Sequence, residues 1–279
     1  MSKSLIQWTH SSWNPVTGCD HVSPGCDHCY AERMAHRLQA MGVNKYRNGF
    51  NVTLHPDALD HPLKWKAPRL VFVNSMSDLF HPEVPISFVR DVFDTIKRAH
   101  QHQFQLLTKR SKRLVRLSGK LDWPDNLWMG VTVELRDYLY RINDLRRTPA
   151  AIKWLSLEPL LGDLGDVDLT DIDWAVVGGE SGPGARPMRR AWVANLRSQC
   201  RKQNVPFFFK QWGGPNKKAT GRLLDGREYS EYPAIPGFQP SLGLRTTDKP
   251  RPPAIDSRRI FTHIDRIRVN QHYHRSKGG

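Results

Sequence analysis

The sequence has few cysteines, no long apolar run and a shortage of acidic residues. Its 279 residues include four cysteines, three of them close together, which does not suit a framework of disulfides. No apolar run reaches the roughly eighteen residues of a membrane span, and residues 1–10 do not resemble a signal peptide. We therefore expect a cytoplasmic protein with reduced thiols and no association with a membrane.

Acidic residues are too few to balance the basic ones. Lys and Arg number 42 and Asp and Glu number 27, so the formal net charge is +15. Such an excess raises affinity for phosphate backbones and favours a nucleic acid or a nucleotide as partner, although a basic surface also serves solubility alone. Residues 109–116 are a basic run without any acid. They either grip phosphates or form a solvated helix face.

What the sequence does have is a compact cysteine loop, residues 19–29, with Cys19, Cys26 and Cys29. Thiolates are soft ligands, and this spacing lets all three share one metal centre. In a four-iron cluster they would leave one iron free for another ligand, whereas a zinc ion would need His21 or His28 as its fourth ligand.

One predicted helix follows the cysteine loop, and another contains the fourth cysteine. Apolar residues recur at helical spacing after the loop and predict a helix that begins near Tyr30. Its first turn would direct unpaired N–H groups toward Cys26 and Cys29. The fourth cysteine, Cys200, lies on the apolar stripe of a second predicted helix, residues 190–202, so we expect it in the core.

Short β-rich runs alternate with helical patterns from residue 70 onward. The predicted strands are residues 6–8, 13–17, 70–73, 103–107, 127–133, 152–157, 172–177 and 205–209. The predicted helices of this region are residues 87–99, 111–117, 136–146 and 190–202. Strands separated by helices pair in parallel through right-handed crossovers. The expected fold class is α/β, a partial (β/α) barrel of six or seven mostly parallel strands.

Two stretches lack this regular alternation. Residues 44–68 show no periodicity and predict an insertion that wraps or covers the cysteine loop. Residues 213–279 are rich in Gly, Pro and basic residues. We therefore divide the chain into a partial barrel, residues 1–212, and a linker with a basic C-terminal extension, residues 213–279, which has a short strand or helix around residues 259–269.

Polar residues follow every one of the longer predicted strands. Because ligands bind at the carboxyl ends of the strands in α/β barrels, we expect these residues to shape a cofactor or substrate site. The candidates are Ser75, Ser77, Asp78, Lys109, Glu134, Glu158, Gly178, Gly179, Glu180 and Lys210. The two glycines permit close backbone approach to a ligand, and Arg186 is a nearby anion partner. Taken singly, any one of these residues is more often a helix cap or part of a solvated loop.

The motif of the cysteine loop resembles a known family. Residues 13–19, Ser23-Pro24-Gly25-Cys26 and Cys29-Tyr30-Ala31-Glu32 resemble the phage-associated three-cysteine-motif proteins, whose domain has no known function and which are similar to radical S-adenosylmethionine enzymes. The resemblance spans roughly residues 5–235. It departs from the radical-enzyme pattern in its first cysteine gap, which holds six residues.

The resemblance implies a radical-enzyme-like barrel. Cys19, Cys26 and Cys29 would hold a [4Fe-4S] cluster whose free iron binds S-adenosylmethionine, and the polar strand ends would contact this cofactor or the substrate. Such an enzyme would need an electron donor protein, and the sequence leaves open whether a second protein completes the system.

Three functional hypotheses follow. The leading one is an iron–sulfur enzyme that cleaves S-adenosylmethionine reductively to start radical chemistry on a nucleic acid or a nucleotide. The second is a non-enzymatic nucleic-acid-binding protein in which the three cysteines and a histidine hold structural zinc. The third is a metal-free α/β hydrolase-like protein, which leaves the cysteine spacing unexplained.

Overall fold

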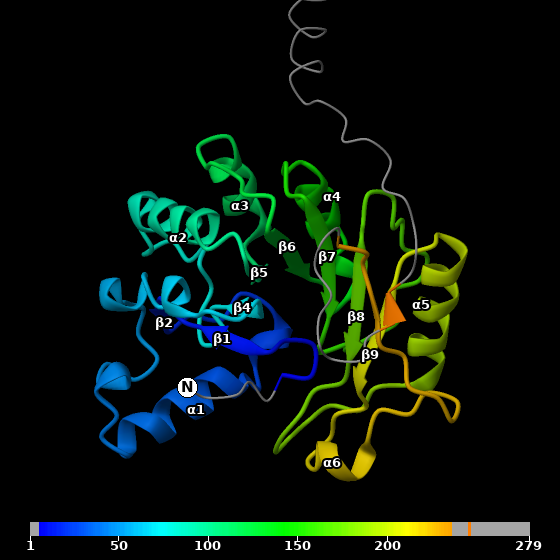
Figure 1. The fold of residues 1–279 in the computed structure, drawn as a ribbon. Helices are drawn as coiled ribbons and strands as arrows, with labels where there is room; N and C mark the ends of the chain where they lie inside the picture. Colours follow the sequence, from blue (N-terminus) through cyan, green and yellow to red (C-terminus); the bar gives the residue numbers. More distant parts are fainter. Residues whose placement is uncertain (1–5, 236–244, 247–279) are drawn as a thin grey trace, which may run out of the picture. The chain divides into compact units, whose positions relative to one another are not determined.

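A seven-stranded sheet organises the chain. The computed structural model describes residues 6–235 and 245–246. The sheet has the order β1-β4-β5-β6-β7-β8-β9, every neighbouring pair is parallel, and the sheet curves into an open half-barrel (Figure 1). Its strands are β1 (Ser11–Trp13), β4 (Leu70–Val73), β5 (Gln103–Thr108), β6 (Leu127–Thr132), β7 (Ile152–Leu157), β8 (Trp174–Gly178) and β9 (Phe207–Gln211). The predicted α/β partial barrel is confirmed.

The helices follow the strands as expected. They are α1 (Tyr30–Ala40), α2 (Ile86–Arg98), α3 (Ser111–Ser118), α4 (Tyr140–Arg146), α5 (Arg190–Lys202) and the short α6 (Lys217–Thr220). The insertion, residues 44–68, contains short 3-10 turns and the strand β3 (Thr53–Leu54), which pairs antiparallel with β2 (Val16–Thr17). No helix within the described residues has the length and apolarity that a membrane crossing requires.

The convex face of the sheet is covered by helices. The apolar face of α2 is buried against the strands and comprises Val89, Val92, Phe93 and Ile96. Burying each such side chain contributes about 1.5–3 kcal/mol. Cys200 of α5 is 1% exposed within the same cluster, which confirms the prediction that it belongs to the core.

The concave face is filled by aromatic side chains at the amino ends of the strands. We call this cluster the aromatic plug; it comprises Trp8, Phe72, Trp128, Trp154, Trp174, Phe208 and Tyr232. The Trp174 ring stacks on that of Tyr232 with centroids 4.9 Å apart. A Cβ at Gly130 would lie only 2.4 Å from the Trp154 ring, so the plug requires glycine there. On β5 the same face carries two glutamines: Gln105 is buried beside Phe72 and Trp128, and Gln103 Oε1 accepts a hydrogen bond of 3.0 Å from Trp128 Nε1.

The predicted strand at residues 6–8 is wrong. This segment forms a turn, and Trp8 enters the aromatic plug, so its apolar character reflects burial at the mouth of the barrel instead of pairing in the sheet. The predicted strand at residues 13–17 is divided because Pro15 lacks an N–H group for a ladder. Trp13 ends β1, and Val16 begins β2.

The chain continues along the barrel after β9. Strand β10 (Glu231–Tyr232) carries Tyr232 into the plug, and the Glu231 carbonyl accepts a hydrogen bond of 2.8 Å from Trp174 Nε1. Strand β10 pairs with β11 (Arg245–Thr246). The remainder of the predicted C-terminal extension, including its element near residues 259–269, lies outside the described residues.

Candidate functional site

The cysteine loop is anchored at the carboxyl end of β4. The Gly18 N–H donates to the Met76 carbonyl at 2.9 Å, and the Cys19 N–H donates to the Phe50 carbonyl at 3.1 Å. Gly18 has φ +85°, and a Cβ there would lie 2.2 Å from the Asn51 carbonyl oxygen. The loop is therefore held between the segment after β4 and the insertion.

Within the loop, tight turns bring the last two cysteines to the start of α1. The Cys26 N–H donates to the Ser23 carbonyl at 2.8 Å, and the Cys29 N–H donates to the Cys26 carbonyl at 3.1 Å. Cys29 caps α1, whose first residue is Tyr30, as the sequence predicted. All three loop thiols are free and partly exposed.

The surroundings of the thiols act on their ionisation in opposite directions. Burial, reinforced by Asp78, raises the pKa of Cys19 to about 12, although Arg110 Nη2, 3.9 Å from the sulfur, opposes this rise. Burial also raises the pKa of Cys29, against the amides of Ala31 and Glu32 and the charge of Lys109. Cys19 and Cys29 therefore hold their protons more tightly than free thiols do, and a bound metal would displace those protons.

The described residues do not present a zinc-binding set of donors around the thiols. Among the described residues, no group of three or more His, Cys, Asp and Glu side chains is placed to hold one metal ion. His21 Nε2 lies 2.9 Å from Glu32 Oε2, and His28 Nδ1 lies 3.0 Å from Glu180 Oε2, so neither histidine is directed at the thiols as a fourth zinc ligand. Cysteine thiolates are the main ligands of iron–sulfur clusters, and the loop offers three of them.

Asp78 links the ends of β4 and β5. Its carboxylate accepts hydrogen bonds from the Thr108 hydroxyl at 2.7 and 2.8 Å and from the Lys109 and Phe80 N–H groups at 3.1 and 2.9 Å. Arg110 Nε lies 3.9 Å from the same carboxylate. Asp78 therefore serves to position the β5 end, and its oxygens are occupied by protein donors.

Arg110 reaches from the end of β5 to the cysteine loop. Its guanidinium pairs with the Asp20 carboxylate, which also lies 3.0 Å from His81 Nε2. Hydrogen bonds and charge from Arg110, followed by the effect of His81, lower the pKa of Asp20 against the effect of burial. Asp20 is therefore an anion held between two nitrogen donors beside Cys19.

Glu134 joins the loop to the end of β6. Its side chain is fully buried, lies 2.9 Å from Arg141 Nη1 and accepts a hydrogen bond from the Ser23 hydroxyl. A Cβ at Gly25 would lie 3.1 Å from the same carboxylate. The buried Glu134–Arg141 pair thus holds the loop against the carboxyl end of β6.

Glu180, after β8, forms the third connection. It accepts hydrogen bonds from the Arg186 guanidinium at 2.5 and 2.9 Å and from the Arg186 N–H at 2.9 Å. Although burial acts in the opposite direction, these bonds and His28 lower the pKa of Glu180 to about 2. Arg186 Nη2 also donates to the Pro24 carbonyl at 2.7 Å, which ties the loop to β8.

Glu158 and Lys210 form a separate pair on the concave side. Lys210 Nζ lies 2.7 and 2.8 Å from the two Glu158 oxygens, and each side chain is 17% exposed. A Cβ at Gly178 would lie 3.1 Å from the Glu158 carboxyl carbon, and one at Gly179 would lie 2.0 Å from the Trp212 carbonyl oxygen. Both glycines therefore permit close packing within the protein.

The two serines after β4 bind the strand beside them. Ser75 Oγ donates to Asn14 Oδ1 at 3.1 Å, and Ser77 Oγ donates to the Val16 carbonyl at 2.8 Å. The Tyr30 hydroxyl donates to the Ser75 carbonyl at 2.6 Å, which ties the start of α1 to the same place. These hydroxyls face the N-terminal segment that leads into the loop.

The structure brings the predicted residues together unevenly. Asp78, Glu134 and Glu180 lie at the ends of β4, β6 and β8 and connect, directly or through arginine, to the loop, whereas Glu158 pairs with Lys210 away from it. Sequence reasoning missed Arg110 and Arg141 as partners of the loop region. Arg110 follows directly after a strand, and this position could have identified it as a site residue. The sequence analysis instead treated it only as part of the basic run.

Comparisons with known proteins add a family and distant structural neighbours. A family model described as "Protein of unknown function (DUF5131)" matches residues 3–233. No curated protein matches the sequence. A solved structure of spore photoproduct lyase complexed with dinucleoside spore photoproduct is similar with a TM-score of 0.44 at 11% identity, over 72% of this chain and 63% of that one. A variant of the same enzyme with bound AdoMet and dinucleoside spore photoproduct gives 0.42 at 11% identity, over 68% and 61%. The chain spans less than two thirds of the length of these structures.

Proposed function

The chain belongs to the family of proteins of unknown function DUF5131, and on that premise we propose that it is an iron–sulfur enzyme of the radical S-adenosylmethionine type that acts on a nucleic acid or a nucleotide. One observation carries the proposal. Three free thiols from one loop sit at the carboxyl edge of a parallel half-barrel, and the loop is fastened there to the ends of β4, β5, β6 and β8.

Cys19, Cys26 and Cys29 would hold a [4Fe-4S] cluster. When bound, such a cluster supplies the electron that cleaves S-adenosylmethionine. The chain's own residues position and shield it: Arg110 and Lys109 place positive charge beside the sulfurs, and the aromatic plug excludes water from the opposite end of the barrel. The loop thus has basic side chains beside it and the water-excluding aromatic plug at the opposite end of the barrel.

The cofactor would be held by the polar strand ends. The proposed contacts are Ser75, Ser77, Asp78, Glu134, Glu158, Gly178, Gly179 and Glu180. Of the carboxylates, Glu158 is best placed to exchange its protein partner for a ligand, because its pair with Lys210 is partly exposed while Glu134 is fully buried. A charged pair of this kind matches the ammonium and carboxylate of an amino-acid group.

Four further predictions are part of this proposal. The chain is related to phage-associated three-cysteine-motif proteins, and it divides into a barrel of residues 1–212 and an extension of residues 213–279. An electron donor protein serves the enzyme, and a second protein completes the system. The zinc-containing nucleic-acid-binding protein is the second candidate. It would require His21 or His28 to leave its carboxylate partner and turn toward the thiols.

Iron analysis separates the two candidates. The protein is purified without oxygen, reconstituted with iron and sulfide, and then reduced in the presence of S-adenosylmethionine. We expect about four irons per chain and the product 5′-deoxyadenosine. A colourless protein that retains a single zinc would favour the second candidate. An intact, fully reduced cluster that yields no 5′-deoxyadenosine would rule out the radical reaction.

A further inference from the structure

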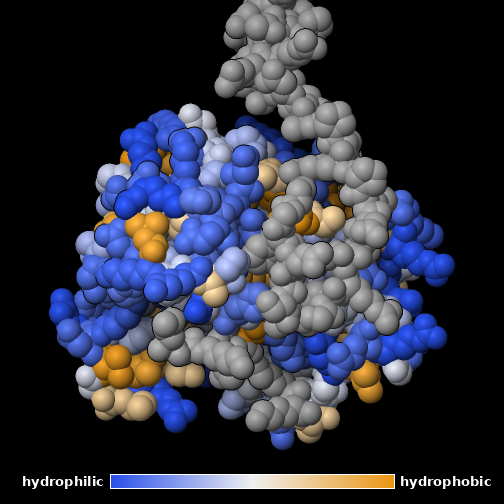
Figure 2. All heavy atoms as spheres, in the orientation of Figure 1, coloured by the Kyte–Doolittle hydropathy of each residue, from blue (hydrophilic) through white to orange (hydrophobic). Residues whose placement is uncertain are grey.

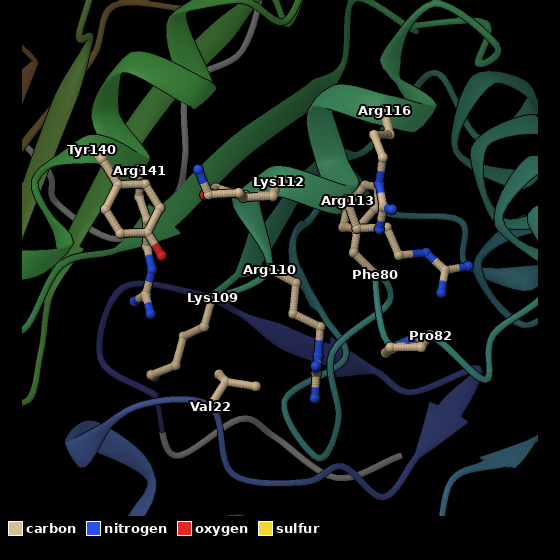
Figure 3. A pocket seen from close by; sticks show the side chains of 11 residues that line it. Val22, Phe80, Pro82, Lys109, Arg110, Lys112, Arg113, Arg116, Tyr140 and Arg141 are labelled. Carbon is tan, nitrogen blue, oxygen red and sulfur yellow. The ribbon is translucent and has the colours of Figure 1, made fainter.

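A basic pocket opens beside the cysteine loop. It has a volume of about 270 Å³ and lies between Val22 of the loop, the turn from β5 into α3, and the start of α4 (Figure 3). Six of the residues that line it are basic, and within the described part of the chain no acidic residue lines it. The basic residues are Lys109, Arg110, Lys112, Arg113, Arg116 and Arg141.

Three of these cations are already bound by the protein. Arg110 pairs with Asp20, and Arg141 pairs with Glu134. Arg113 donates to the carbonyls of His81 and Val84 at 2.7 and 2.6 Å. These contacts fix the walls of the pocket.

The other three cations have no acidic partner among residues 6–235. They are Lys109, Lys112 and Arg116, and the Lys112 ammonium instead lies 4.8 Å from the centre of the Tyr140 ring. Burial is the main cause that lowers the pKa of Arg113, and repulsion from Arg116 and Arg110 adds to it against the effect of Asp78. A bound anion would relieve this repulsion.

We infer that this pocket binds the phosphodiester backbone of a nucleic-acid strand and leads it past the cysteine loop. The inference rests on the proposed function, because it names the substrate class of that same site. A strand carries one charge per nucleotide along its length, whereas a free nucleotide gathers its charges at one end.

The arrangement of the cations fits an extended anion. Lys112 and Arg116 are four residues apart on α3 and therefore share a face, about 6 Å apart along the helix axis. Lys109 lies on the loop side of the pocket (Figure 3). The surface over α2 and α3 is mostly hydrophilic, so a strand approaching this face meets little apolar surface (Figure 2).

The pocket also offers a surface for a base. Tyr140 is 39% exposed at the rim, and bases stack on exposed aromatic rings irrespective of sequence. Val22, 38% exposed, provides an apolar contact between Cys19 and Cys26. Because Arg110 lines the pocket and its Nη2 lies 3.9 Å from the Cys19 sulfur, a strand held here lies beside Cys19.

Binding of a labelled single-stranded oligonucleotide to the full chain, measured by fluorescence anisotropy at several salt concentrations, tests the inference. The double variant Lys112→Gln/Arg116→Gln should bind about tenfold more weakly and should reduce the salt slope by about 1.4. Tyr140→Ala should weaken binding about fivefold or more. Both altered cations are exposed, so the fold should be unchanged by circular dichroism.

A matched control removes two charges elsewhere. Arg201→Gln/Lys202→Gln lies at the exposed end of α5 and should change binding less than twofold. An equal loss in both double variants would overturn the inference in favour of non-specific charge. Displacement of the oligonucleotide by an equal concentration of a nucleoside triphosphate would overturn it in favour of a site for free nucleotides.

Failure of this inference is distinguishable from failure of the proposed function. The binding measurement needs neither cluster nor reductant, and 5′-deoxyadenosine formation needs no oligonucleotide. Pocket-dependent binding without any radical product would uphold the strand site and reject the radical enzyme. Radical product with no oligonucleotide binding would uphold the radical enzyme and reject the strand site.

Discussion

The two halves of the concave face are built by the same strands and have opposite characters. Toward the amino ends, aromatic rings predominate and contact one another, as in Trp174 of β8, which stacks on Tyr232 of β10. At the carboxyl ends, residues in line with them are small or polar, such as Gly178 after Trp174 and Lys210 after Phe208. One half stabilises the barrel by burial, and the other keeps charges that burial alone would not favour.

The two halves differ in their charged residues, which lie at the carboxyl ends of the strands. The aromatic plug consists of large buried rings, which carry no charge. The carboxyl half contains carboxylates that are each satisfied by a specific donor, such as Glu134 by Arg141 and Glu180 by Arg186. Stability and candidate function are therefore separable by mutation, and three experiments examine how completely.

The largest expected effect is at the cysteine loop. Cys26→Ala should abolish iron incorporation and 5′-deoxyadenosine formation while leaving the unfolding transition of the iron-free chain within about 0.5 kcal/mol, because this thiol is partly exposed. Iron analysis and denaturant unfolding measure both. Cys200→Ala is the matched control and should keep its iron. Loss of iron in both variants would mean that the loop has no special role.

The converse experiment removes part of the aromatic plug. Trp174→Ala should lower the free energy of unfolding by about 3–5 kcal/mol, since it leaves a cavity among buried rings. Urea denaturation followed by circular dichroism measures the loss. Below its unfolding midpoint the variant should still incorporate iron. If iron uptake fell while the chain remained folded, the two halves would not be separable.

The smallest expected effect is the pH dependence from Glu180. Its folded-state pKa is lowered from 4.5 to about 2, so its stabilisation is full above pH 4.5 and is lost as the pH falls toward 2. The shift corresponds to about 3 kcal/mol at most. Unfolding free energies between pH 6 and pH 2 should therefore fall more steeply for the unmodified protein than for Glu180→Gln.

Glu83→Gln provides the comparison for that measurement. Glu83 is exposed and lies outside the contacts of the cysteine loop. Its removal should leave the acid limb of the stability profile unchanged. A profile of Glu180→Gln that coincides with that of Glu83→Gln would show that the Glu180–Arg186 contact contributes nothing to stability.

Local patterns predicted the elements well because each is determined by neighbouring residues. Strands β4 and β7 and helix α5 have the predicted boundaries, since the apolar run or helical apolar spacing of each ends abruptly. The segment Ile6–Trp8 was wrong because an apolar residue that fills a barrel end looks the same as one in a strand.

The partners within the site were not predictable in the same way. Ser23 meets Glu134 across 111 residues of sequence, and His28 meets Glu180 across 152. Such contacts depend on the path of an irregular loop over the sheet, which no local spacing encodes. The sequence could therefore predict that polar residues gather at the strand ends, but not which of them would be engaged by the loop.

The anchoring of the cysteine loop has a consequence for how iron would enter. Restricting a free backbone costs about 1–2 kcal/mol per residue. Because Arg110, Glu134 and Arg186 already hold the segment that carries the thiols, an incoming cluster would meet ligands whose conformational freedom has been reduced in advance. Unlike small domains that fold only around their metal, the iron-free chain should resist proteolytic cleavage between Gly18 and Tyr30.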